Sequence, residues 1–233
     1  MPDPRWERRR GDPPELFALD LFTPDGSLAG FVGLAFQAGV AWYWAGLVGD
    51  GRPYLLVRDA DVALPRSSAS LELRAEGLWA DHTCETPFDH WSYGLEAFGV
   101  ALDDPDEALG AERGDRTPLG FDLDWEATAE PDGGDGAYAQ PGIVHGEVLV
   151  GSERLAFDGL GWRRHEWGGI SAAGFAGVTA DGGPVRQSPV EPAAVVTLHR
   201  APLVLPGGVL DRRLGRVGDA LGWAEWLRPP RPG

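Results

Sequence analysis

The residues from Gly159 to Gly169 form the part of the sequence best suited to chemistry. These eleven residues include two tryptophans, two arginines, one histidine and one glutamate. If the stretch is a strand, its side chains alternate between two faces. One face then carries Arg163, His165 and Trp167, and the other carries Trp162, Arg164 and Glu166.

An imidazole between a guanidinium and an indole is a candidate acid–base group, because its ordinary pKa is near 6.5 and its neighbours can shift it. The sequence therefore makes His165 a candidate catalytic residue. The alternative is structural, because arginine stacked on tryptophan is a common stabilising pair and a lone histidine usually only forms hydrogen bonds.

A second cluster runs from Trp79 to Glu85. His82 and Cys84 are two residues apart, so in a strand they share one face and could offer two metal ligands. A zinc site needs three or four protein ligands, and the sequence identifies no others, so we expect no metal. The alternative is a half-buried strand in which the cysteine acts as a small apolar residue.

Tryptophan is unusually frequent, with 10 in 233 residues. Indole rings can wall a pocket for a flat or polyene-like ligand, can stack on sugars, or can fill a β-sheet core. The sequence contains no glycine-rich phosphate loop, no Gly-x-Ser-x-Gly elbow and no His-Glu-x-x-His motif. Nucleotide-dependent and serine-hydrolase chemistry are therefore not favoured.

The elements that must position these residues are predicted to be strands. The 34 glycines and 20 prolines separate short apolar runs, which is typical of an all-β protein. Residues 119–126 alternate between apolar and polar, as expected for an antiparallel strand with one solvent-exposed face. Residues 40–48 and 53–57 are apolar on both faces. They are predicted to be central strands, or strands between a core and a ligand cavity.

Turns and helices are also predicted. Asp25-Gly26 and Asp50-Gly51 suit hairpin turns. Residues 105–109 could form one helical turn capped by Asp104. Apolar residues recur at helical spacing in residues 211–227, which predicts a helix there.

Composition narrows the class of protein. Hydrophobic residues make up 43% and charged residues 24%, as in a globular protein with a real core. The net charge of −16 disfavours binding to nucleic acid. The sequence shows no signal peptide and no run of ~18 apolar residues, so we expect a cytoplasmic protein without a membrane span.

An acidic, glycine-rich stretch at residues 129–136 is predicted to be a surface loop that divides the chain. On that basis we expect a polar tail over residues 1–14, an N-terminal β domain over residues 15–130 and a C-terminal β domain over residues 137–233.

The segment from Tyr138 to Trp167 carries a family resemblance. Tyr138-Ala-Gln-Pro-Gly142 leads to Gly146-Glu-Val-Leu-Val150 and then to Gly161-Trp-Arg-Arg-His-Glu-Trp-Gly168. This resembles the carotenoid 1,2-hydratase and AttH-like superfamily of lipocalin-related proteins, in particular its uncharacterised actinobacterial members. The resemblance covers about residues 15–170.

The family signature reads Gly-x-Arg-Asp-x-Ser-Trp-Gly. Arg163, Trp167 and Gly168 match it, whereas Arg164 replaces the aspartate and Glu166 replaces the serine. The replaced aspartate could have oriented the arginine or donated a proton. Glu166 offers a carboxylate two positions later, on the same predicted strand face as Arg164.

The resemblance implies an all-β fold of lipocalin-like antiparallel β-barrels in tandem. The chain is short for two full barrels, so we expect an incomplete second barrel. Its uncovered sheet edges predict a homodimer. Characterised relatives hydrate isolated double bonds or template polyene cyclisations, and these reactions need no dissociable cofactor.

We therefore expect a protein that binds a lipophilic small molecule (an isoprenoid, polyene or polyketide) in an aromatic-lined barrel cavity. Cofactor-free hydration, isomerisation or cyclisation is the expected chemistry. Protonating an alkene requires a carboxylic acid kept protonated near neutral pH, and burial achieves this. Glu166 is the best-placed acid and His165 its catalytic companion, with Asp81 and Glu85 as alternative acids. The expected ligand-binding residues are Arg163, Trp167, Trp162, Trp42, Trp44, His82 and Trp91.

Three other functions remain open. The same fold could be a non-catalytic lipophile carrier. It could be a degenerate homologue with a structural role, or a module that stacks tryptophans on sugars.

Overall fold

The computed structural model describes residues 3–8, 14–37, 39–65, 67, 70–134, 136–167 and 173–229. Within these residues the chain forms two antiparallel sheets. The strands of the larger sheet are β1 (Glu15–Phe22), β2 (Leu28–Phe36), β3 (Ala41–Gly49), β4 (Tyr54–Val62), β5 (Leu73–Ala75), β6 (Leu78–Thr86), β7 (His90–Leu102), β8 (Asp115–Ala127), β9 (Asp132–Gly134), β10 (Ala137–Val150) and β11 (Glu153–Trp167).

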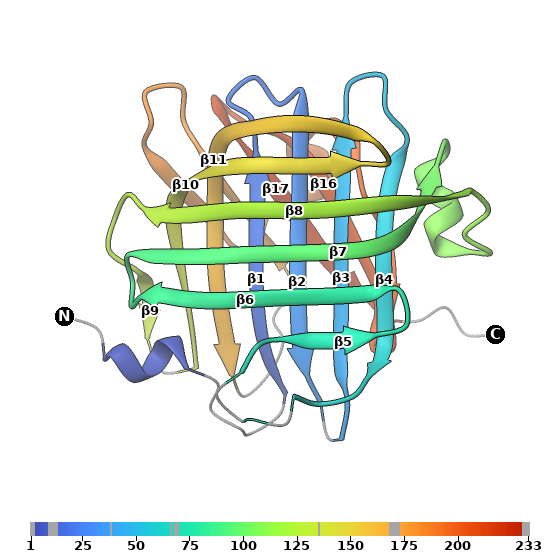
Figure 1. The fold of residues 1–233 in the computed structure, drawn as a ribbon. Coiled ribbons are helices and arrows are strands. Elements are labelled where there is room, and N and C mark those ends of the chain that lie inside the picture. The colour runs from blue at the N-terminus through green and yellow to red at the C-terminus, as the bar shows by residue number, and fades with distance from the viewer. Residues whose placement is uncertain are drawn as a thin grey trace.

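The larger sheet closes on itself. Its strand order is β4-β3-β2-β1-β11-β10-β8-β7, and the far end of β7 pairs with β4 through Tyr54–Leu102 and Leu56–Val100. β6 and β5 continue from β7, and β9 pairs with β10. In Figure 1 the β6–β8 strands cross in front of the upright β1–β4 strands. The prediction of an all-β, lipocalin-like antiparallel barrel is confirmed.

The smaller sheet is open and packs against the outside of the barrel. Its strands are β12 (Ala173–Val178), β13 (Pro184–Gln187), β14 (Val196–Arg200), β15 (Leu203–Leu205), β16 (Gly208–Val217) and β17 (Ala220–Arg228). The order is β13-β12-β17-β16-β14, with β15 paired to β16. Figure 1 shows β16 and β17 behind the barrel strands β1–β4.

Both faces of β1, β2 and β3 are buried, which explains the apolar runs in this part of the sequence. In β1, Phe17 and Leu19 face the barrel interior, whereas Leu16 and Ala18 face the second sheet. Strands that carry a core on each face need apolar residues at almost every position. The residues at 40–48 and 53–57 are therefore central strands between two layers.

Tight contact between neighbouring strands depends on small residues at a few positions. The indole of Trp44 lies over Gly33 on the adjacent strand, and a Cβ built on Gly33 would come within 2.1 Å of it. Only glycine leaves room for the ring there.

The predicted turns occur where expected. Gly26 and Gly51 adopt positive φ angles of 79° and 66° in the turns after β1 and β3. Residues Pro105–Leu109 form the 3-10 helix η2, and the Asp104 side chain caps it by accepting a bond from the Asp106 backbone NH. The other short helices are η1 (Pro4–Glu7) and η3 (Pro192–Ala194).

The prediction of a helix over residues 211–227 is wrong. These residues form most of the β16–β17 hairpin, with Val217 paired to Ala220 across the turn. Gly218 occupies that turn with a φ of 61°. Glycine also disfavours a helix. The apolar residues recur at a helix-like spacing because they come from buried positions on two strands, and the turn between the strands breaks the two-residue alternation.

The barrel includes strands from both of the segments predicted to be β domains. β10 and β11 lie within the segment predicted as the C-terminal domain, and both are strands of the barrel. Among described residues, the chain passes from the barrel to the second sheet between Trp167 and Ala173. Residues 3–8 of the predicted polar tail contribute a buried side chain, that of Glu7. No helix in the described ranges is long and apolar enough to span a membrane.

Candidate functional site

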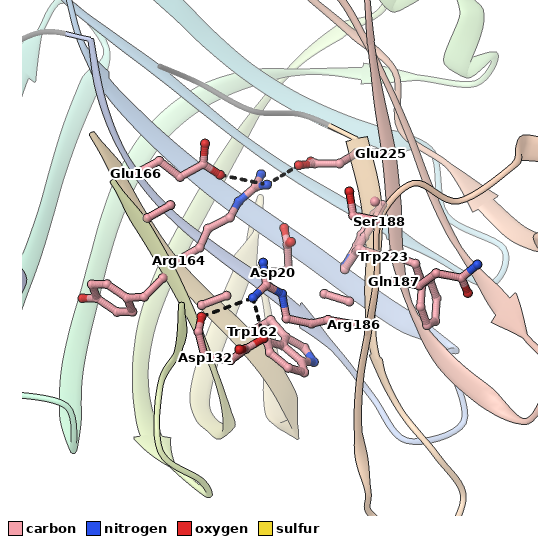
Figure 2. Close-up of a pocket in the computed structure, with 16 residues that line it drawn as sticks. Asp20, Asp132, Trp162, Arg164, Glu166, Arg186, Gln187, Ser188, Trp223 and Glu225 are labelled. Carbon is pink, nitrogen blue, oxygen red and sulfur yellow. Dashed lines mark hydrogen bonds and ion pairs between the residues drawn. The ribbon is translucent and has the colours of Figure 1, made fainter. Parts of the chain in front are cut away.

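A cavity of about 320 Å³ lies between the barrel and the second sheet. The barrel contributes residues of β1, β10 and β11, and the second sheet contributes residues of β12, β13 and β17. Figure 2 shows labelled side chains from both sheets pointing toward one another across this space. Its lining residues are Asp20, Asp132, Ala137, Tyr138, Ala139, Trp162, Arg164, Glu166, Gly174, Phe175, Ala176, Arg186, Gln187, Ser188, Trp223 and Glu225.

The alternation of β11 brings the predicted residues to this cavity. Trp162, Arg164 and Glu166 all line it, as expected for side chains on one strand face. Trp162 lies opposite Asp20 in the β1–β11 register, so the neighbouring strand adds a carboxyl group to the same face. The Trp162 indole NH donates a 3.1 Å hydrogen bond to the Gly177 carbonyl and so ties the barrel to β12.

Five charged side chains form a continuous network at one side of the cavity. Arg164 is ion-paired with Glu166, at 3.5 Å, and more closely with Glu225. Arg212 bonds to Glu225 at 2.9 Å and also to Asp20. The network therefore links both sheets, and Figure 2 shows Arg164 between Glu166 and Glu225.

Burial sets the protonation of this network. Burial raises the pKa of Asp20, and the nearby Arg212 and Arg164 guanidinium groups offset only part of that effect. Burial acts in the same direction on Glu225, but Arg164 and Arg212 outweigh it and lower the pKa of that carboxyl. The three carboxyl groups outnumber the two guanidinium groups. One proton held on Asp20 would make the cluster neutral, which is the cheaper arrangement for buried charge.

Arg163 faces the other way, into the barrel. Its guanidinium carbon lies 4.8 Å from the Trp91 ring centre and 5.0 Å from that of Trp125. Its Nη2 atom donates to Glu7 at 2.7 Å, in an ion pair whose two side chains are 2% and 1% exposed. Glu7 belongs to η1, and the alternation of residues along the strands does not predict that its side chain reaches Arg163.

His165 is also inside the barrel and not in the cavity. Its Nδ1 atom donates to the Trp6 carbonyl at 2.5 Å, and its Nε2 atom lies 2.8 Å from Glu15 Oε1. The ring stacks on Phe17 at 3.9 Å between centres. His165 is fully buried, so these contacts hold η1 and β1 together.

The remaining predicted residues occupy other places. Trp44 is buried between the barrel and the second sheet, and Trp42 is partly buried beside it. Trp167 packs near Trp6, with ring centres 6.0 Å apart. Gly168 lies outside the described residues.

His82 lies deep in the barrel. Neither of its ring nitrogens has a hydrogen-bond partner among the residues that the structure describes, and its ring centre is 4.9 Å from that of Tyr93. Burial lowers the pKa of His82 to about 3, so the ring is neutral. Burial likewise raises the pKa of Cys84 to about 12, which keeps its thiol protonated.

The structure thus separates the predicted residues into two groups. Trp162 and Glu166 line the inter-sheet cavity, whereas Arg163, His165, His82 and Trp91 lie within the barrel. Sequence reasoning missed Asp20, Glu225 and Arg212. A usable signal existed for Asp20, which is an isolated acid in the otherwise apolar run from Leu16 to Phe22.

The solved structures that are similar to this chain include the following two. A protein assigned as an AttH from Nitrosomonas europaea is 11% identical, with 92% of this chain and 89% of that chain covered and a TM-score of 0.44. CghA is also 11% identical, with 93% of this chain covered and a TM-score of 0.35. This chain spans 58% of the CghA chain. None of the curated proteins compared with the sequence matched it.

The family comparison covers most of the barrel, including β1, β11 and the side chains that both strands contribute to the cavity. The family described as a domain of unknown function, DUF7064, matches residues 13–170, which is more than half of the chain, and the protein therefore belongs to that family.

Proposed function

We propose that the protein binds a small, largely apolar molecule in the cavity between its two sheets and protonates it there. The observation that carries this proposal is a cavity with both an apolar wall and a buried acid–base network. Trp162, Phe175 and Trp223 supply large apolar surfaces, and Asp20, Arg164 and Glu225 supply charged groups. Ligand sites commonly combine such walls with a few convergent polar groups.

The cavity volume limits the ligand. About 320 Å³ is near the lower end of the range for small-molecule sites. It equals roughly ten water molecules at ~30 Å³ each, which suits a ligand of one or two rings. A monocyclic or bicyclic isoprenoid or polyketide therefore fits the cavity better than a long carotenoid does.

Asp20 is the proposed proton donor. Burial raises the pKa of Asp20, and a protonated carboxyl group that lines a cavity can protonate an alkene or a carbonyl oxygen. Protonating an alkene carbon leaves a carbocation and the Asp20 carboxylate. The face of the Trp162 indole can stabilise that cation. Loss of a proton from the cation, or from an added water molecule, back to Asp20 completes isomerisation or hydration.

Glu166 remains a second candidate acid, as proposed from the sequence. It lines the same cavity and pairs with Arg164 at 3.5 Å. Arg164 stands where the resembling family has aspartate, and here it connects Glu166 with Glu225. We propose that Arg164 orients both carboxylates. No cofactor or metal is part of this proposal.

A non-catalytic carrier is the second candidate function. One observation favours it: Asp20, Glu166 and Glu225 are all engaged in ion pairs with arginine. Carboxylates held by arginine in this way could simply complement a polar ligand group without transferring a proton.

Farnesol, a bicyclic sesquiterpene alcohol and a C40 carotenoid can serve as probes. We expect the first two to quench tryptophan fluorescence saturably and the carotenoid not to do so. Ala176→Phe should abolish the quenching because Ala176 lines the cavity. Ala156→Phe is the matched control because Ala156 is exposed on β11. Equal quenching of both variants would contradict binding in this cavity.

Turnover distinguishes the two functions. Gas chromatography of long incubations should show a product with the wild-type protein and none with Asp20→Asn. Unchanged ligand with both proteins would favour the carrier. Product from Asp20→Asn but not from Glu166→Gln would move the proton donor to Glu166.

A further inference from the structure

A second constellation of polar groups lies at one end of the barrel, around Arg163 on the face of β11 opposite to the inter-sheet cavity; Tyr138 belongs to it and also lines that cavity. Several donors converge there on the carboxylate of Glu7. Arg163 Nη2 donates to Oε1 at 2.7 Å, and the Tyr138 hydroxyl donates to the same oxygen. The Trp91 indole NH donates to Oε2 at 2.5 Å, and the Cys84 sulfur lies 3.8 Å from it.

The barrel wall builds this site without help from Glu7. Trp91 is on β7, Tyr138 on β10 and Arg163 on β11, and all three are buried in the paired strands of the barrel. Aromatic rings fix the guanidinium in place, with the Tyr138 ring centre 5.2 Å from its central carbon. Arg163 Nη1 also donates to the Tyr138 hydroxyl at 2.9 Å. Donors held in this way are preorganised for a carboxylate.

The occupant, by contrast, belongs to no sheet. Glu7 ends the four-residue helix η1. The preceding Trp6 ring lies 6.2 Å from the Tyr138 ring, nearly parallel to it, and 6.0 Å from the Trp167 ring. Together the Trp6 ring and the Glu7 carboxylate present an aromatic group and an acid to the barrel end.

Space and unsatisfied donors adjoin this site. A hollow of about 520 Å³ is lined by Pro4, Phe88 and Gln140, among others. Gln140 is itself next to the site, because its side-chain oxygen accepts from Arg163 Nη2 at 3.4 Å. Within the described part of the chain, the buried Arg163 Nε atom has no hydrogen-bond partner, and neither has the Trp125 indole nitrogen. The pocket thus holds more donor capacity than the single Glu7 carboxylate uses.

We propose that this end of the barrel is a binding site for a small aryl carboxylic acid, and that Trp6 and Glu7 occupy it as an internal competitor. The ligand carboxylate takes the bonds that Glu7 makes to Arg163, Tyr138 and Trp91. Its aromatic ring takes the place of Trp6 against Tyr138. The site is independent of the proposed function of the inter-sheet cavity.

Competition predicts a specific pattern of affinities. With an internal competitor, the apparent affinity equals the intrinsic affinity multiplied by the fraction of molecules in which the site is open. If that fraction is about 10% or less, removing the competitor strengthens binding by about tenfold or more. Titration calorimetry with 3-phenylpropanoate measures this, and 3-phenylpropanamide is the matched neutral probe.

We expect wild-type protein to bind the acid weakly and Glu7→Ala to bind it at least about tenfold more tightly. Neither protein should bind the amide. Adding Tyr138→Phe to Glu7→Ala should weaken binding several-fold because it removes one donor. Ala176→Phe, which fills the other cavity, should leave the affinity for the acid unchanged. If Glu7→Ala does not fold, Glu7→Gln keeps the shape of the side chain while removing its charge, and it should also bind the acid more tightly than wild type.

Three results would overturn the proposal. Equal affinity of wild type and the Glu7 variants would show that Glu7 does not compete. Equal binding of acid and amide would show that the carboxylate is not recognised. Absence of acid binding to both Glu7 variants would make the Glu7–Arg163 pair a structural element only.

Discussion

Replacing Glu7 with alanine should destabilise the protein far more than its position near the N-terminus suggests. The Arg163 and Glu7 side chains are 2% and 1% exposed. Removing Glu7 leaves a buried guanidinium without its counter-ion, and it removes the acceptor used by Tyr138 and Trp91. Removal of one partner from a buried pair typically costs about 3–5 kcal/mol.

In a protein of 150–250 residues, each kcal/mol shifts the melting temperature by about 2–4 °C. The expected decrease is therefore about 6–20 °C. Urea unfolding followed by tryptophan fluorescence and circular dichroism gives the free energy, and calorimetry gives the melting temperature.

Glu153→Ala is the matched control. Glu153 pairs with Arg52 at 2.7 Å, but its side chain is 48% exposed, so solvent screens the pair and its loss should change the stability little. Combining Glu7→Ala with Arg163→Met should cost less than the sum of the single changes, because the two residues interact. A Glu7→Ala effect no larger than that of Glu153→Ala would refute the reasoning.

Three further predictions follow from individual contacts. Asp20 has a raised pKa in the folded state, so its contribution to stability is full below about pH 4 and is lost as the pH rises through the raised pKa. The unfolding free energy of wild type minus that of Asp20→Asn should therefore fall as the pH rises above about 4; a difference independent of pH would count against a raised pKa. Gly33→Ala should cost about 1–3 kcal/mol because its Cβ would come within 2.1 Å of the Trp44 ring, and an unchanged urea midpoint would show that the ring can move aside. The open second sheet ends at β14, where Val196 is 68% exposed and Leu198 is 44% exposed. Because an uncovered apolar sheet edge can pair with a second copy, light scattering should detect a dimer of the 25.0 kDa chain. A monomer at all concentrations would contradict this.

The fold was largely predictable because strand periodicity is local. Leu119, Phe121, Leu123 and Trp125 alternate with polar residues, and all four are buried in the barrel. The separation of Arg163 from Arg164 onto opposite faces of β11 also followed from alternation. The hairpin over residues 211–227 was mistaken for a helix, because buried positions on two short strands can imitate a helical repeat.

The sites were less predictable because they depend on contacts between distant residues. Arg212 reaches Asp20 across 192 positions of sequence, and Arg163 reaches Glu7 across 156 positions. No spacing rule links such pairs. The sequence also placed the cavity inside the barrel, whereas the cavity that Trp162 and Glu166 line lies between the barrel and the second sheet.

The most direct test of ligand binding between the sheets is mass spectrometry of the organic extract from natively purified protein. Wild type, Ala176→Phe and Ala156→Phe are compared after purification in parallel. We predict a small lipophilic compound in the extracts of wild type and Ala156→Phe, and none in the extract of Ala176→Phe. The same compound in equal amounts from all three proteins would contradict a binding site between the two sheets.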